Sequence, residues 1–271
     1  MYSAAHIQSV AKREFFAYSV AMGAIKGIIL DKDGTLFDYG KVWGPVLSSA
    51  ISRGLAKAKM PEKRKNECIS DFCRIVGVDG DGNTYPDGII FRHDKLLSAT
   101  LRVLSLTFHY RMNPWRVWKS VKGILNHEDF GFSERLEHMT FPYVKEVIKA
   151  MHDRGYIIGI VTTDTDISTE LFLKKMEITE YISFRRTKDS PTHKKPNPEA
   201  IREFCSEFNL ESSEIAVVGD TIVDMEFAKE GKAGYAVAVL TGSGDIEGLG
   251  EKADAVYPEL KDILSDPVLF S

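Results

Sequence analysis

Outside residues 40–140, the chain alternates short apolar segments with longer segments of helical periodicity. The apolar segments read as buried strands and lie at 26–31, 156–162, 181–184, 214–220 and 235–240, with a last short strand and helix within 255–264. The helical segments lie at 141–155, 165–176, 197–209 and 222–230. Strands that are apolar along their whole length are covered on both faces, and a helix between successive strands lets them pair in parallel. The alternation therefore predicts an α/β fold, a Rossmann-like parallel sheet core with helices on both faces.

Residues 40–140 break this rhythm with several helical segments in a row. These segments lie at 44–58, 61–77, 93–110 and 114–125. We therefore expect a helical second domain at 40–140, inserted into a core formed by 22–39 and 141–271. The tryptophans of the insert, Trp43, Trp115 and Trp118, are expected in its own hydrophobic core.

Residues 1–21 are expected to form an N-terminal extension before the core. Their apolar positions fit an amphipathic helix, and Glu14 interrupts the apolar stretch that a signal peptide would need. Translation from Met22 is the alternative.

Composition limits the partners of the chain. The net charge of the 271 residues is −4, with acidic and basic side chains interspersed, which favours neither a nucleic-acid groove nor an anionic membrane. No apolar run approaches the roughly 20 residues of a membrane helix. The three cysteines form no CxxC pair, which fits a reducing compartment. We expect a cytoplasmic monomer or homodimer that acts on a small molecule, with no nucleic-acid or membrane partner.

Polar side chains follow three of the predicted strands at their carboxyl ends. Asp31 and Asp33 follow the first strand, Thr162 follows the second, and Asp220 follows the strand at 214–220. Asp224 lies four residues further on, and Lys194 and Lys195 lie in the loop before the helix at 197–209. The carboxyl ends of parallel strands meet at one edge of the sheet, so these groups are expected around one crevice.

Such a set of groups needs a compensating cation, because like charges held close together repel. Oxygen-only ligands with several carboxylates suit Mg²⁺, which shares its coordination with a phosphate. A carboxylate beside that cation can attack phosphorus and form an aspartyl phosphate. A second acid two residues away can protonate the leaving alcohol and then remove a proton from the attacking water.

In this order, "DKDGT", a Thr after an apolar strand, a Lys before Pro-x-Pro and "GDTIVD" resemble the four motifs of the haloacid dehalogenase-like hydrolase superfamily. The helical insert resembles the mobile cap of that family. The segment "FPYVKEVIKAMHDRGYIIGIVT" resembles the return into the core in phosphoglycolate phosphatase-like members.

The resemblance implies a role for each candidate residue. Asp31 resembles the nucleophile and a metal ligand, and Asp33 resembles the acid/base, whose backbone carbonyl also meets the metal. Thr162 resembles the phosphate-binding hydroxyl and Lys195 the motif lysine. Asp220 resembles the second direct metal ligand, with Asp224 supporting it directly or through water.

Two positions depart from the family pattern. Thr163 stands where members often carry Asn, which leaves Thr162 and Thr163 as alternatives for the phosphate-binding hydroxyl. Lys32 stands where a bulky apolar residue is common. Its side chain is expected to point away while its backbone N–H faces the phosphate.

The expected function is hydrolysis of a small phosphomonoester by a Mg²⁺-dependent phosphatase, through an aspartyl phosphate on Asp31. The resemblance implies phosphoglycolate or a sugar phosphate as substrate. Asp33 argues against a dehalogenase, whose family members carry Tyr at that place. A hexose-phosphate phosphomutase shares the aspartate pair and stays an alternative. A non-catalytic phosphate- or partner-binding protein on the same scaffold is a third reading.

Overall fold

A computed structural model describes residues 24–55, 60–85, 88, 96–113, 115, 140–190, 194–242 and 246–270 of the chain. The predicted extension at 1–21 and the alternative start at Met22 lie outside these residues. The chain divides into two compact units, one with Met1–Phe37 and Thr140–Ser271 and the other with Asp38–Met139.

The first unit is built on one sheet of six parallel strands in the order β3-β2-β1-β4-β5-β6. The strands are β1 (Gly27–Leu30), β2 (Ile157–Val161), β3 (Phe184–Arg186), β4 (Ile215–Gly219), β5 (Tyr235–Val239) and β6 (Ala255–Tyr257). β1 pairs in parallel with β2 on one side and β4 on the other, so the strand order reverses beside it. Ligands of open α/β sheets bind at such a switch point, outside the carboxyl ends of the strands.

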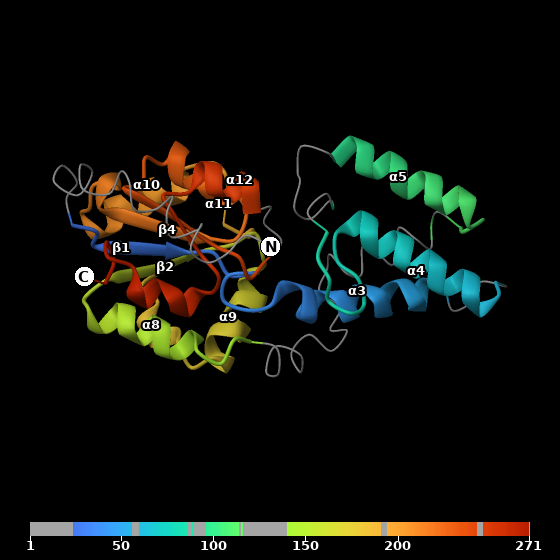
Figure 1. Cartoon of the computed structure of the whole chain (residues 1–271), viewed down its shortest axis with the longest axis horizontal. Coiled ribbons are helices and arrows are strands. Elements are labelled where there is room, and N and C mark those ends of the chain that lie inside the picture. Colours follow the sequence, from blue (N-terminus) through green and yellow to red (C-terminus); the bar gives the residue numbers. More distant parts are fainter. Residues whose placement is uncertain are drawn as a thin grey trace. The chain divides into compact units, whose positions relative to one another are not determined.

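Helices cover both faces of this sheet, which confirms the predicted fold class. α8 (Val144–Asp153) and α9 (Asp166–Lys175) lie on one side in Figure 1. α10 (Glu199–Phe208), α11 (Ile222–Glu230) and α12 (Ile246–Lys252) lie on the other. Short 3-10 helices at Thr179–Tyr181, Ser212–Glu214 and Leu260–Ser265 complete the unit.

Two elements differ from the sequence prediction. The strand expected at 181–184 begins only at Phe184, because Thr179–Tyr181 form a 3-10 turn before the ladder to β2 starts. α12 was not predicted, since its seven residues include two glycines, which weaken the helical signal.

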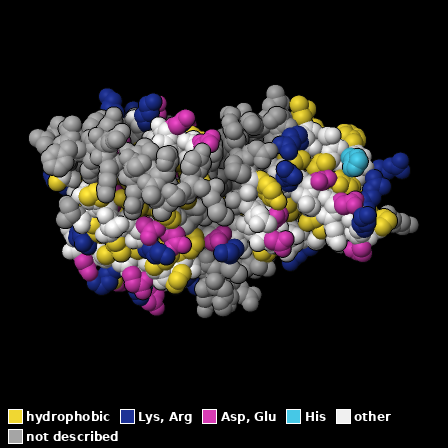
Figure 2. Space-filling model, in the orientation of Figure 1, with side chains coloured by type: hydrophobic (Ala, Val, Ile, Leu, Met, Phe, Trp, Pro, Cys, Tyr) yellow, Lys and Arg dark blue, Asp and Glu magenta, His cyan; other side chains and the backbone are white. Residues whose placement is uncertain are grey.

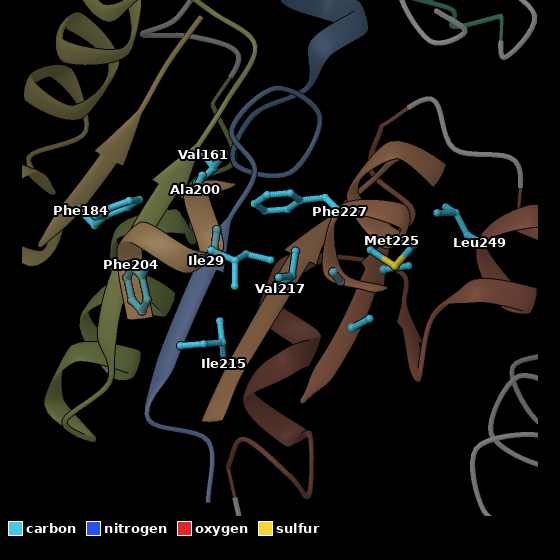
Figure 3. Packing of buried hydrophobic residues seen from close by; sticks show 14 residues of the cluster. Ile29, Val161, Phe184, Ala200, Phe204, Ile215, Val217, Met225, Phe227 and Leu249 are labelled. Carbon is cyan, nitrogen blue, oxygen red and sulfur yellow. The ribbon is translucent and has the colours of Figure 1, made fainter. Parts of the chain in front are cut away.

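One core cluster packs α10 against β1 and β2 through the ring of Phe204, which is fully buried. Two strand glycines make room for that ring. A Cβ on Gly27 would lie 2.5 Å from a Phe204 ring carbon, and a Cβ on Gly159 would lie 2.9 Å from another. Figure 3 shows Phe204 beside Phe184, whose ring centroid is 5.2 Å away in an edge-to-face arrangement. The glycines thus allow α10 to approach the strands that carry the site.

The second unit contains the helices α3 (Tyr39–Leu55), α4 (Glu62–Val76) and α5 (Leu96–His109). Its buried residues include Leu55, Cys68, Phe72 and Tyr110 in one cluster. The prediction that the tryptophans are core residues is wrong for Trp115, whose side chain is 74% exposed. Its backbone N–H donates to the Asn113 side chain at 2.9 Å. Trp43 is half-buried, and Trp118 lies outside the described residues.

The surface carries charges of both signs. Basic and acidic side chains are intermixed on the face drawn in Figure 2. Among the residues that the structure describes, no helix is long and apolar enough to cross a membrane.

The core analysis predicts a large effect of Phe204→Ala. Removing this ring leaves a cavity over Gly27 and Gly159, so the free energy of unfolding should fall by about 3–5 kcal/mol. Urea denaturation measures the change. Phe208→Ala is the control, since Phe208 is only partly buried at the margin of the same cluster and should cost clearly less. Equal losses for the two variants would contradict the packing described.

Candidate active site at the carboxyl ends of the strands

The predicted site residues meet where β1, β2 and β4 end. Asp31 follows β1, and its backbone N–H still donates to Val218 in β4, 2.8 Å away. Thr162 follows β2 and Asp220 follows β4. Each residue is the first after its strand, so the sheet itself sets its position.

Three of the aspartates form a buried acidic cluster. Each of Asp31, Asp220 and Asp224 offers a carboxylate oxygen, and these oxygens lie within 4.8 Å of one another. Exposed fractions are 8%, 1% and 2% respectively, so water screens little of their repulsion. The donors are all hard oxygens, the set that divalent cations such as Mg²⁺ prefer. The cluster therefore fits a metal ion.

Asp224 is aimed into the cluster by the start of α11. Its Oδ2 accepts from the backbone N–H of Thr221 at 3.1 Å and from the Thr221 hydroxyl at 2.6 Å, which forms a capping box. The other oxygen, Oδ1, contacts Lys195. The sequence "GDTIVD" therefore places its second aspartate by local helix capping as well as by spacing.

Asp220 lies in a slot that only glycines leave open. A Cβ on Gly242 would lie 1.7 Å from Asp220 Oδ2, and a Cβ on Gly34 would lie 2.4 Å from the same oxygen. Gly34 also has φ = 93°, a conformation that favours glycine. The Thr35 hydroxyl donates to Asp220 Oδ1 at 3.3 Å. Gly242 is a contributor to the site that the sequence analysis missed, because nothing in the local sequence shows that its loop meets β4.

Lys195 bridges two members of the acidic cluster from the loop before α10. Its ammonium contacts Asp31 Oδ1 and lies 2.6 Å from Asp224 Oδ1. Burial alone would lower the pKa of Lys195, but Asp224 and Asp31 raise it above its ordinary value. Lys194, the other lysine of the loop, is exposed. The structure thus brings Lys195, and not its neighbour, into the site.

The buried position of Asp31 among charged groups raises its pKa. The pKa of Asp31 is raised to about 7: burial is the largest cause, Lys195 opposes it, and the charges of Asp224 and Asp33 add to the rise. Without a cation the site therefore holds a proton on Asp31 over much of the acidic pH range.

Thr162 and Thr163 differ sharply in environment. Thr162 is buried, its hydroxyl donates to Asp33 Oδ2 at 3.2 Å, and its oxygen accepts from the backbone N–H of Asp164 at 3.1 Å. Thr163 is exposed. Of the two alternatives, the structure places only Thr162 beside the aspartate pair.

Lys32 does not point away, contrary to the sequence expectation. Its side chain is fully buried, and its ammonium lies 2.9 Å from Asp33 Oδ2 and 2.8 Å from Asp164 Oδ2. Burial would lower the pKa of Lys32, but the two carboxylates raise it above its ordinary value. The physical reason for the difference is charge: a buried ammonium between the buried Asp164 carboxylate and the half-buried Asp33 carboxylate is held by both, whereas an apolar side chain would only pack. The sequence analysis assigned no role to Asp164.

The Asp220 slot leads to a prediction for Gly242→Ala. The new methyl group would displace the Asp220 carboxylate, so the affinity for a divalent cation should fall roughly 10- to 100-fold, as when metal-orienting groups are altered. Isothermal titration with Mg²⁺ measures it. Gly250→Ala is the matched control, because a Cβ there meets nothing within 4 Å. Unchanged affinity in Gly242→Ala would show that Asp220 does not need this slot.

Comparison with known proteins agrees with this geometry. The family model for haloacid dehalogenase-like hydrolases matches residues 25–232. The chain is 29% identical over 254 residues to a phosphoglycolate phosphatase of Salmonella typhimurium, and 26% identical over 247 residues to that of Salmonella typhi. Both alignments cover 89% of this chain and 91% of the relative.

A crystal structure described as a predicted phosphoglycolate phosphatase from Haemophilus somnus 129PT is similar in fold. The TM-score is 0.62 at 22% identity, over 90% of this chain and 99% of the other. The family match covers the strands β1 to β4, all four motifs and the insert between β1 and β2. The chain is therefore a member of the haloacid dehalogenase-like hydrolase family.

Proposed function

We propose that the chain is a Mg²⁺-dependent phosphatase that hydrolyses a small phosphomonoester through an aspartyl phosphate on Asp31. The observation that carries the proposal is the position of Asp31: it is the first residue after the central strand, it belongs to the acidic cluster, and it contacts Lys195. Membership of the hydrolase family supports the same reading.

The acidic cluster supports Mg²⁺ as the cofactor. Asp31, Asp220 and Asp224 would hold the ion, together with the backbone carbonyl of Asp33. When bound, Mg²⁺ neutralises charge on the phosphoryl oxygens and offsets the repulsion within the cluster. The nucleophile, the acid/base and the groups that bind the phosphoryl oxygens are side chains of the protein.

Asp31 and Asp33 divide the chemistry between them. An oxygen of Asp31 bonds to phosphorus while the bond from phosphorus to the ester oxygen breaks, and Asp33 gives a proton to that oxygen, so a neutral alcohol leaves. Asp33 then takes a proton from water as the water oxygen bonds to phosphorus. The bond from phosphorus to Asp31 breaks, which releases inorganic phosphate and restores both carboxyl groups.

Thr162 and Lys195 bind the phosphoryl group and offset negative charge during these two steps. The Thr162 hydroxyl lies 3.2 Å from Asp33 Oδ2 and can donate to a phosphoryl oxygen instead. Lys195 offsets the negative charge that Asp31 and Asp224 bring to the site. Both groups are buried, so their interactions with the phosphoryl group are weakly screened.

The relatives favour phosphoglycolate or a similar small phosphomonoester as substrate, because the two curated relatives named above are phosphoglycolate phosphatases. The intermixed surface charge in Figure 2 also suits a small substrate better than a nucleic acid.

Phosphate release from a panel of small phosphomonoesters tests the proposal. We expect turnover with Mg²⁺, none with chelator, and a loss of at least about 10³-fold in Asp31→Asn, since an amide cannot act as the nucleophile. Asp153→Asn, an exposed aspartate of α8, is the control and should keep full activity. Absence of release from every ester would refute the phosphatase. A phosphorylated protein without release would favour the phosphomutase.

The proton affinity of Asp31 leads to a prediction on metal binding. The pKa of Asp31 is about 7 in the metal-free fold, so below pH 7 a cation must displace a proton. The Mg²⁺ affinity should therefore rise from pH 5.5 to pH 7, by up to about tenfold per pH unit for one released proton, and level off near pH 8. Titration calorimetry in buffers of different ionisation enthalpy measures both affinity and proton release. An affinity that does not change with pH would contradict the raised pKa.

A further inference from the structure

The loops after β1 and β2 are joined by a closed ring of contacts. Asp33 Oδ2 accepts from the Thr162 hydroxyl at 3.2 Å and lies 2.9 Å from the Lys32 ammonium. That ammonium lies 2.8 Å from Asp164 Oδ2, and the backbone N–H of Asp164 donates back to Thr162 at 3.1 Å. Lys32 is thus the cationic link between two carboxylates from different strand ends.

The surroundings of Lys32 are those of an apolar side chain. It is fully buried, and its ammonium lies 4.7 Å from the ring centroid of Phe37 and 5.6 Å from that of Phe172. Stability alone is a poor reason for a charge at this place, because a buried ion pair is often no better than apolar residues of similar volume. What the charge does to its partners is the better explanation.

We propose that Lys32 is a positioning residue for Asp33: its buried ammonium, anchored on Asp164, holds the Asp33 carboxyl in the orientation needed for proton transfer to and from the substrate. The inference rests on the proposed phosphatase function, and it assigns to Lys32 a role that its position between the two aspartates does not by itself imply.

The anchor at the other end of Lys32 is itself well held. Asp164 Oδ1 accepts from the backbone N–H of Thr165 at 2.7 Å, at the start of α9. Asp164 Oδ2 is left to contact Lys32. Asp164 therefore connects the Lys32 ammonium to the start of a helix, and this connection limits the movement of the Asp33 carboxyl.

The need for Lys32 follows from the single proton of the Thr162 hydroxyl. In the structure that proton is donated to Asp33 Oδ2. When Thr162 donates to a phosphoryl oxygen instead, it can no longer hold Asp33. Lys32 still contacts Oδ2 in that state, when the orientation of the carboxyl decides whether a proton can be transferred.

A leaving-group comparison with Lys32→Met tests this role. An alkyl phosphate needs a proton on its leaving oxygen, whereas p-nitrophenyl phosphate needs little help. General acid catalysis contributes about 10²–10⁴-fold. We expect kcat/KM to fall at least about tenfold more for the best alkyl ester than for p-nitrophenyl phosphate, with little change in KM for either. Asp164→Asn, which weakens the anchor, should shift the two esters in the same direction by less.

Lys149→Met is the matched control, because Lys149 is an exposed lysine of α8 paired with Asp153. It should leave both esters unchanged. Equal losses on both esters in Lys32→Met would mean that Lys32 has only a structural role, and would overturn the inference while leaving the phosphatase intact. Wild-type protein that hydrolyses no ester would instead refute the proposed function.

A crystal structure of Lys32→Met gives a reading that does not depend on turnover. With inorganic phosphate bound in the site, so that the Thr162 hydroxyl donates to the anion, we expect the Asp33 carboxyl to leave its place beside Thr162. A carboxyl that stays there overturns the inference, whatever the activity. Should Lys32→Met fail to fold, the same comparison with Asp164→Asn decides, since that variant keeps the lysine and a neutral acceptor.

Discussion

Electrostatic repulsion among buried carboxylates is the constraint around which this protein is organised. Parallel strands bring Asp31, Asp33, Asp164 and Asp220 to one edge of the sheet, and a helix cap adds Asp224. Two buried lysines, Lys32 and Lys195, compensate only part of that charge. Burial, together with the charge that remains, raises the pKa of Asp31, and the carboxylate oxygens form a cluster suited to a divalent cation. The uncompensated charge of this cluster is thus what the proposed cation would neutralise.

The two lysines divide this work between two halves of the site. Lys195 contacts the half that contains Asp31 and Asp224, the metal ligands and nucleophile of the proposed mechanism. Lys32 contacts the half that contains Asp164 and Asp33, the acid/base of the proposed mechanism. In the proposed mechanism this separation lets Asp31 stay ionised beside a cation while Asp33 is held independently. The two carboxylates are separated by one residue in the sequence but lie in different environments.

Much of this arrangement is predictable from sequence, because strand ends and helix caps are local features. The parallel sheet and the convergence of Asp31 and Asp220 follow from apolar runs and the polar residues after them, and the family resemblance singled out Lys195. The rest depends on contacts between distant loops. Gly242 could not be assigned to Asp220 from its local sequence. The buried position of the Lys32 side chain depends on Asp164, which is more than a hundred residues away in the sequence. The exposure of Trp115 depends on tertiary packing.

Covalent trapping tests the central claim, that the crowded Asp31 carboxylate is the nucleophile. The protein would be mixed with excess phosphomonoester and Mg²⁺, quenched in acid within milliseconds, digested and analysed by mass spectrometry. The account predicts one phosphoryl group on the peptide that contains Asp31, located on that residue by fragmentation and absent in Asp31→Asn. Turnover with the phosphoryl group on another residue, or with no phosphorylated peptide at any quench time, would contradict it.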